Sequence, residues 1–374
     1  MHQLIASPFL GQYLVLRPGH ACGVRIPETR YRQLREAVAD GRPAPRWLHD
    51  AAAQAWKLEL PDTGPGAAPL GDVLLVREPS PYGLARASYE INKGCDYDCP
   101  HCYLGQKKFE GLAWEHKERL LEIMRDAGVL WLQITGGEPL IDRHFPAVYT
   151  HASELGMMVT ISSNGSQLAK PLFIDLFTRM RPYRITLSVY GATEGTYDRF
   201  TRNRGAFDRF TRALAAAREA QLPVRLNIVV SDSNAHELDA MRQLADRYGF
   251  PHHTYTNMSP TIAGGAEPLP TQATDFLRQR KPFTGCNAGH TFFHADPFGI
   301  ASICKVGRDP NINLIKEGVE GLSRLGSIAD SLMLRTGGCS GCQLSGTCWT
   351  CRPLAKLYQE AKAPRNAYCQ HSER

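Results

Sequence analysis

The middle of the chain alternates between two hydrophobic periodicities. Between about residues 86 and 260, short apolar runs of strand length are separated by segments whose apolar residues recur at helical spacing. This alternation is typical of parallel βα units. It predicts six strands, at residues 88–92, 130–134, 157–161, 184–189, 224–230 and 252–256. We therefore expect an α/β fold built on a partial (β/α)6 barrel.

The first 60 residues follow a different pattern. Two short strands are expected at residues 12–19 and 21–26, around a Pro-Gly turn. Two amphipathic helices follow, the first with Tyr31 and Leu34 on its apolar face and the second with Trp47 and Leu48. The next segment is rich in Pro and Gly, which is typical of a linker. The predicted parts are an N-terminal α+β module (1–60), a linker (61–85), the barrel (86–268) and a C-terminal domain (269–374).

Composition and charge narrow the class of protein. The chain has 374 residues, of which 43% are apolar and 21% charged, as is ordinary for a globular protein of two or three domains. The net charge of +6 is mild and the basic residues are scattered, so no nucleic-acid partner is expected. The sequence shows neither an apolar run of about 18 residues nor a signal-peptide pattern. We therefore expect a cytoplasmic protein without a membrane partner.

The eleven cysteines are the main candidate for chemistry. In a protein expected to be cytoplasmic, tightly spaced cysteines favour metal ligation over disulfides. Cys95, Cys99 and Cys102 share one short loop after the first barrel strand, at C-x3-C-x2-C spacing. Such thiols can ligate three irons of a [4Fe–4S] cube and leave the fourth iron without a protein ligand. The alternative is a zinc knuckle or a set of buried thiols. Cys22 stands apart and is expected to be buried.

A second motif, Gly136-Gly137-Glu138-Pro139, follows the second predicted strand. The cysteine loop and this turn together resemble the radical S-adenosylmethionine (SAM) superfamily. In that family SAM closes the fourth iron site, and an electron from the cluster cleaves SAM to methionine and a 5′-deoxyadenosyl radical. The resemblance implies that the two glycines let the backbone approach SAM, and that Glu138 and nearby carbonyls receive its ammonium group.

Other SAM contacts are expected at the carboxyl ends of the next strands, where the chemistry of such barrels gathers. Ser163 and Asn164 could bind the SAM carboxylate, and Ser188 could reach a ribose hydroxyl. The alternative is ordinary turn chemistry, since Ser and Asn favour loops. Many relatives carry an Asp near the ribose where this chain has Tyr190, so the ribose contact stays open.

A second block of cysteines follows residue 280: Cys286, Cys304, Cys339, Cys342, Cys348, Cys351 and Cys369. Their order resembles the SPASM extension of peptide-modifying radical SAM enzymes, which holds two auxiliary iron–sulfur clusters. The resemblance implies one cluster on Cys339, Cys342, Cys348 and Cys369. It implies a second on Cys286, Cys304 and Cys351, whose fourth iron is open to substrate or closed by a side chain such as His290. The last spacing is x2 instead of the usual x3, which leaves the ligand geometry open, and the block alone also fits two zinc sites.

The resemblance covers roughly residues 86–369 and implies an oxidoreductase with SAM and three [4Fe–4S] clusters. The expected substrate is a ribosomally made precursor peptide or a protein that receives an intramolecular crosslink, and the expected electron donor is a flavodoxin or ferredoxin. By element order, the N-terminal module resembles winged-helix modules that bind a leader peptide along a strand edge, or else it is a structural cap. Peptide epimerisation, sulfatase-maturing oxidation and small-molecule chemistry are alternatives, and a non-catalytic zinc scaffold is one of another class.

Overall fold

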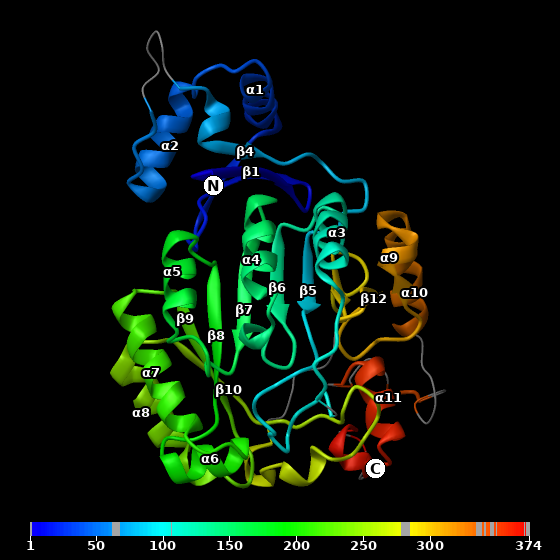
Figure 1. Cartoon of the computed structure of the whole chain (residues 1–374). Helices are drawn as coiled ribbons and strands as arrows, with labels where there is room; N and C mark the ends of the chain where they lie inside the picture. Colours follow the sequence, from blue (N-terminus) through cyan, green and yellow to red (C-terminus); the bar gives the residue numbers. More distant parts are fainter. Residues whose placement is uncertain are drawn as a thin grey trace.

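The computed structural model describes residues 2–61, 68–105, 107–277, 285–333, 339, 342–344, 348, 350–369 and 371. Two sheets organise these residues (Figure 1). The smaller has the strand order β3-β2-β1-β4, and the larger has the order β10-β9-β8-β7-β6-β5-β11-β12-β13. Within the described residues, no helix combines the length and the hydropathy needed to cross a membrane.

The smaller sheet and two helices form the N-terminal module. Its elements are β1 (Leu4–Phe9), β2 (Gln12–Leu16), β3 (Gly23–Ile26), α1 (Glu28–Ala39), α2 (Arg46–Trp56), η1 (Leu70–Asp72) and β4 (Leu74–Val76). Strand β1 was not predicted, and β4 lies inside the predicted linker. Because β4 pairs in parallel with β1, Leu4 opposite Leu74, the linker cannot extend over 61–85 as predicted. Residues 62–67 of that linker lie outside the described residues.

One cysteine of this module contradicts its prediction. Cys22 is exposed rather than buried, because it lies in the turn before the outermost strand β3. Its carbonyl accepts a hydrogen bond from the Trp56 indole at 3.0 Å.

The barrel strands confirm the predicted α/β fold, each beginning within two residues of its predicted start. They are β5 (Arg86–Glu90), β6 (Trp131–Thr135), β7 (Met158–Ser163), β8 (Arg184–Val189), β9 (Val224–Val229) and β10 (His252–Tyr255). All neighbouring pairs among them are parallel. The sheet then continues through β11 (Phe292–Ala295), β12 (Ile300–Ser302) and β13 (Ile312–Asn313). Because β11 pairs in parallel with β5, the predicted boundary at residue 268 divides one continuous sheet.

Helices cover the outer face of this sheet (Figure 1). They include α3 (Trp114–Asp126), α4 (Phe145–Glu154), α5 (Pro171–Arg179), α7 (Ala206–Glu219) and α8 (Leu238–Tyr248). Two helices, α6 (Glu194–Thr201) and α11 (Arg352–Glu360), lie toward the carboxyl ends of the strands (Figure 1), and the chain also forms α9 (Leu314–Glu317) and α10 (Leu325–Met333). Short 3₁₀ turns are η2 (Pro139–Ile141), η3 (Ala235–Glu237), η4 (Leu269–Thr271), η5 (Thr274–Phe276), η6 (Val319–Arg324) and η9 (Arg365–Ala367). In β8, Ile185 and Leu187 are buried in the core, while Thr186 and Ser188 between them are half-buried. Since side chains alternate along a strand, the main core lies outside the sheet and the inner face is polar.

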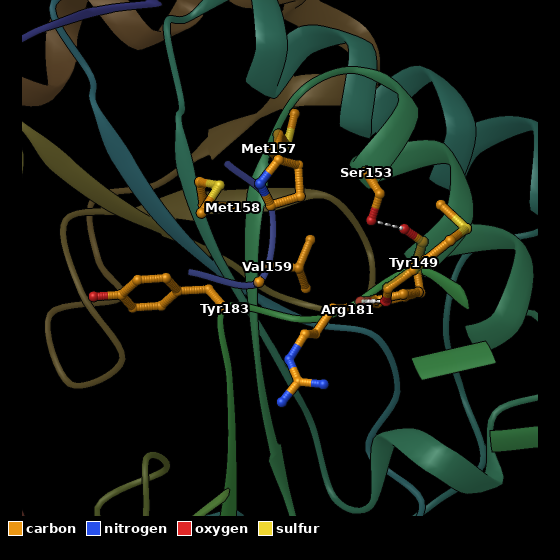
Figure 2. Close-up of a pocket in the computed structure, with 10 residues that line it drawn as sticks. Tyr149, Ser153, Met157, Met158, Val159, Arg181 and Tyr183 are labelled. Carbon is orange, nitrogen blue, oxygen red and sulfur yellow. Dashed lines mark hydrogen bonds between the residues drawn. The ribbon is translucent and has the colours of Figure 1, made fainter. Parts of the chain in front are cut away.

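The N-terminal module packs on the amino ends of the barrel strands, opposite the ends where the cysteine loop lies (Figure 1). Ile5 and Leu16 of its sheet pack against Leu130 and Met158 of the barrel. A void of about 10 Å³ lies at this seam, between the Pro18-Gly19 turn and the start of β7 (Figure 2). It holds no more than about one water molecule and is therefore a packing defect rather than a ligand site.

Candidate functional site

The three predicted cluster cysteines lie together in the loop that follows β5. Cys99 is buried and within electrostatic reach of Cys95 and Cys102, which are half-buried. The Tyr97 N–H donates to the Cys95 sulfur at 3.4 Å, and backbone N–H groups also bond to the Cys102 sulfur. Burial raises the pKa of the Cys95 thiol to about 12, so a thiolate here requires a cationic partner.

This environment fits an iron–sulfur cluster. A bound metal ion supplies the missing positive charge and keeps its coordinating thiols deprotonated. Hydrogen bonds to sulfur are among the features that tune such clusters. Within the described residues, no three His, Cys, Asp or Glu side chains converge as a single-ion site requires, whereas the thiolates of a cube hold separate irons.

Hydrogen bonds attach the cysteine loop to the ends of the neighbouring strands. The Asn164 amide, just after β7, donates to the Asp96 carboxylate at 2.8 Å. The Asn203 amide donates to the Asp96 carbonyl at 2.5 Å, and the Asp98 N–H donates to the Thr201 carbonyl at 2.9 Å. The loop is therefore positioned by the carboxyl edge of the barrel and not only by its own strand.

The Gly136-Gly137 turn packs directly on the cysteine loop. A Cβ at Gly137 would lie 2.0 Å from the Gly94 carbonyl oxygen, and one at Gly136 would lie 2.6 Å from that of Asn92. The Glu138 N–H then donates to the Gly94 carbonyl at 2.8 Å. The backbone of the turn approaches the cysteine loop too closely for any residue larger than glycine at these two positions. In the structure the close contact is with the cysteine loop. The predicted approach of these glycines to SAM stays a prediction.

Glu138 joins the second and third strands from inside the protein. Its fully buried carboxylate accepts hydrogen bonds from Leu140 N (2.9 Å), Ser163 Oγ (2.7 Å) and Asn164 N (2.6 Å). Burial raises the pKa of Glu138 to about 8. Pro139, the last residue of the motif, begins η2. The predicted contacts of Glu138, Ser163 and Asn164 with SAM stay predictions, since all three side chains bond within the protein.

Ser188 and Tyr190, two residues apart near the end of β8, have different surroundings. Ser188 is half-buried on the inner face of the barrel, as its predicted ribose contact requires. The Tyr190 ring is buried, stacks on Phe200 at 5.0 Å between ring centroids, and lies 5.4 Å from the ring of His101 in the cysteine loop. Tyr190 therefore supports the cysteine loop instead of replacing the polar contact of an Asp.

The first two cysteines of the C-terminal block lie near each other. Cys304 follows β12 and is within electrostatic reach of Cys286, and its sulfur accepts the Gly307 N–H at 3.2 Å. His290, the proposed closing ligand, contacts the Asp330 carboxylate of α10 at 2.9 Å. The predicted pairing of Cys286 with Cys304 is compatible with this arrangement and stays a prediction.

Other cysteines of the block are associated with α11 and the turn that follows it. The Cys339 sulfur accepts a hydrogen bond from Gln359 of α11 at 3.4 Å, and Cys351 immediately precedes that helix. The Cys369 N–H donates to the Arg365 carbonyl at 2.8 Å. Cys342 and Cys348 lie between Cys339 and Cys351, in a stretch of which the structure describes only part. The division of these cysteines between two clusters stays a prediction.

A buried charged group that the sequence did not reveal joins the two cysteine regions. The carboxylate of Glu90, at the end of β5, is fully buried and accepts from the Arg308 guanidinium at 2.8 Å and from the Tyr103 hydroxyl at 3.2 Å. Lys305 donates to the same hydroxyl at 3.2 Å. Glu90 and Arg308 are 218 residues apart, so local spacing gives no signal of their contact.

Together, a partial α/β barrel and a three-cysteine loop at the carboxyl end of its first strand define the class of protein. Residues 89–245 match the family model described as the radical SAM superfamily. Over these residues the chain is similar to that superfamily, as the resemblance of its motifs predicted.

Curated relatives match this central part of the chain. The PqqA peptide cyclase of Bradyrhizobium diazoefficiens is 25% identical over 190 residues, which cover 46% of this chain and 50% of that protein. The AdoMet-dependent heme synthase of Methanosarcina barkeri is 25% identical over 180 residues, which cover 47% and 51%. The chain therefore spans about half the length of the curated relatives that it matches.

Solved structures share the fold over a longer stretch. Streptococcus suis SuiB bound to the precursor peptide SuiA superposes with a TM-score of 0.61 over 98% of both chains, at 14% sequence identity. The enzyme anSMEcpe with bound AdoMet gives 0.52 at 12% identity, over 74% of this chain and 92% of that chain. At such low identities the similarity establishes the fold alone.

Proposed function

We propose that this chain is a radical SAM enzyme that abstracts hydrogen from a peptide and forms an intramolecular crosslink in a ribosomally synthesised precursor. One observation carries the proposal: the cysteine loop, the Gly-Gly-Glu-Pro turn and the end of β7 are hydrogen-bonded into a single carboxyl edge, through Gly94, Asp96 and Asn164. The similarity to PqqA peptide cyclases and the fold shared with peptide-bound SuiB support a peptide as the substrate.

The residues of this edge have separate roles in the proposal. Cys95, Cys99 and Cys102 hold the [4Fe–4S] cluster, which together with SAM supplies a 5′-deoxyadenosyl radical when both are bound. Asn164 holds the loop in place through Asp96. The half-buried polar positions of the inner face, such as Ser188, are available to SAM and the peptide.

The seven C-terminal cysteines are proposed to hold two auxiliary clusters. Full occupancy of all three sites predicts about twelve irons per chain and little zinc, and the zinc-scaffold alternative predicts the reverse. Spectroscopy of Cys351→Ala, with and without substrate, tests the inner cluster. An inner-cluster signal that is unchanged in both samples would contradict the assignment. A flavodoxin or ferredoxin in the cytoplasm is the proposed electron donor.

The N-terminal module is proposed to bind the leader of the precursor. Strand β3 is one of the two edge strands of the small sheet, and Gly23 and Arg25 on it are exposed. An outermost strand can pair with an extended peptide through main-chain hydrogen bonds. Leader-peptide binding by the β3 variant Arg25→Pro tests this role, because the variant loses an N–H that points away from β2.

The test of the proposed activity is formation of 5′-deoxyadenosine after anaerobic reconstitution with iron and sulfide, then addition of dithionite and SAM. We expect formation by the wild type and by Cys22→Ala, because Cys22 is an exposed thiol of the N-terminal module. We expect none from Cys99→Ala. Equal amounts from both variants would refute the role of the loop, and a crosslinked peptide found by mass spectrometry would identify the product.

A further inference from the structure

Glu90 lies where the barrel meets its C-terminal extension. It is the last residue of β5, which is flanked by β6 on one side and β11 on the other. Its carboxylate has no solvent exposure. The loop of Cys102 and the loop of Cys304 both reach this carboxylate, although more than 200 residues separate them in sequence.

The contacts of the carboxylate come from the two loops that carry candidate cluster ligands and from the adjoining strand. Tyr103, directly after Cys102, donates its hydroxyl to Glu90 at 3.2 Å. Arg308, in the loop that begins at Cys304, donates to the same oxygen at 2.8 Å, and its Nε donates to the Lys305 carbonyl at 2.8 Å. Lys305 also donates to the Tyr103 hydroxyl at 3.2 Å, which closes a ring of contacts between the two loops.

The second carboxylate oxygen faces the adjoining strand β11. His294 Nε2 lies 3.6 Å from it, and the other ring nitrogen of His294 is hydrogen-bonded to Ser88 at 2.8 Å. Burial alone would raise the pKa of Glu90, but the nearby His294 ring and the charges of Arg308 and Lys305 outweigh it and lower the pKa to about 2. The group therefore acts as a fixed negative charge.

A buried ion pair usually adds little to the free energy of folding, because the cost of desolvating both charges cancels much of their attraction. Well-packed apolar side chains of similar volume stabilise a protein equally well or better. In some proteins a buried charge instead specifies one arrangement, because its hydrogen-bond donors must surround it in a defined geometry. Here the groups that must be arranged are the two loops that carry Cys102 and Cys304.

We propose that Glu90 is a positioning residue that fixes the Cys102 loop and the Cys304 loop relative to each other. The site that cleaves SAM and the candidate auxiliary cluster then face one shared substrate space. The second part of this inference rests on the proposed function, but the coupling of the two loops does not.

The test is hydrogen–deuterium exchange of the reconstituted protein, followed in peptides that cover residues 102–105 and 304–308. We expect Glu90→Gln to raise exchange in both segments by roughly tenfold or more, because a charged hydrogen-bond acceptor is lost. Strand β7, at residues 158–163, serves as the internal reference. Arg77→Lys is the matched control, since Arg77 is equally a buried charge but lies at the opposite end of the barrel.

The outcomes separate coupling from general destabilisation. Faster exchange in both loops with β7 unchanged supports the proposal, and a change in one loop or in neither overturns it. If β7 also exchanges faster, Arg308→Gln decides, because Arg308 retains partial exposure and its loss removes the same contact from the other side. Arg308→Gln must then increase hydrogen–deuterium exchange in the Cys102 loop, which is distant from Arg308 in sequence. If exchange there is unchanged, the proposal fails.

Peptide chemistry provides a second readout. The Glu90→Gln variant should still form 5′-deoxyadenosine but should yield less crosslinked peptide per 5′-deoxyadenosine than the wild type. An unchanged ratio would overturn the role in chemistry. Failure of the wild type to form 5′-deoxyadenosine would instead refute the proposed function and leave the exchange result intact.

Discussion

Arg77 should hold the N-terminal module on the barrel, and its replacement by Met should separate them. Its side chain, just after β4, is only 6% exposed. The guanidinium donates to the carbonyls of Val129 at 2.7 Å and Gly156 at 3.2 Å, both at the amino ends of barrel strands, and more weakly to Arg125 at 3.4 Å. The Arg77 carbonyl in turn accepts the Tyr31 hydroxyl, which links α1 to the same point.

Two opposing terms set the size of the effect. Arg77→Met leaves the two nearest carbonyls buried without a donor, at about 1–3 kcal/mol each. It also removes a buried cation, whose pKa burial lowers from 12.5 to about 10. That shift corresponds to roughly 3 kcal/mol against the charged form and offsets part of the loss. At about 2 kcal/mol per carbonyl the balance is a net loss of about 1 kcal/mol in docking, and at most about 3 kcal/mol, which raises the undocked population by roughly 5-fold to 100-fold.

Chymotrypsin cleavage after Tyr82, in the segment between module and barrel, measures this population. The control is Arg35→Met, because the Arg35–Glu78 ion pair is 45% and 66% exposed and should contribute less than about 1 kcal/mol. Equal cleavage rates for the wild type and Arg77→Met would refute the reasoning. If Arg77→Met and Arg35→Met increased the cleavage rate equally, the positive charge in general, and not the buried contacts of Arg77, would hold the module on the barrel.

Two further variants test the carboxyl edge. Gly137→Ala places a Cβ 2.0 Å from the Gly94 carbonyl and should abolish 5′-deoxyadenosine formation in a folded protein, whereas Gly195→Ala, with open space around it, should be neutral in the same assay. Burial raises the pKa of Glu138 from 4.5 to about 8, so the folded state holds this proton more tightly and stability should fall as pH rises between those values. Urea unfolding from pH 5 to pH 8 should show that Glu138→Gln flattens this decline, and an equal slope in both proteins would contradict it.

The sequence predicted the elements whose signals are local. Six strands were identifiable because each is a short apolar run between helical patterns, and Cys95, Cys99 and Cys102 because one loop carries them. The close approach of Gly137 to Gly94 was not predictable, since it depends on how two separate loops meet. Strand β4 was missed because only three residues pair with β1, directly after a segment rich in Pro and Gly.

Burial of charge was the least predictable property. Cys22 was expected to be buried because free cysteines usually are, but its position before an outermost strand leaves it exposed. Glu and Arg are residue types that usually lie at the surface. Glu90 and Arg77 are buried because partners from distant segments of the chain form hydrogen bonds with them. These partners are set by the tertiary fold, which a local pattern does not report.

The position of the N-terminal module constrains how a leader peptide can serve the proposed active site. The module contacts the amino ends of the strands, and the cysteine loop follows their carboxyl ends. Strands of five or six residues separate the two ends, which is about 20 Å at 3.3 Å per residue. A peptide held at β3 must therefore keep at least about six extended residues between its leader contact and the modified residue. A precursor with a shorter spacer should still bind but not be crosslinked, whereas added Gly-Ser residues should be tolerated because longer flexible loops cost little. Crosslinking of a precursor without a spacer would show that the leader is not held on this module during the reaction.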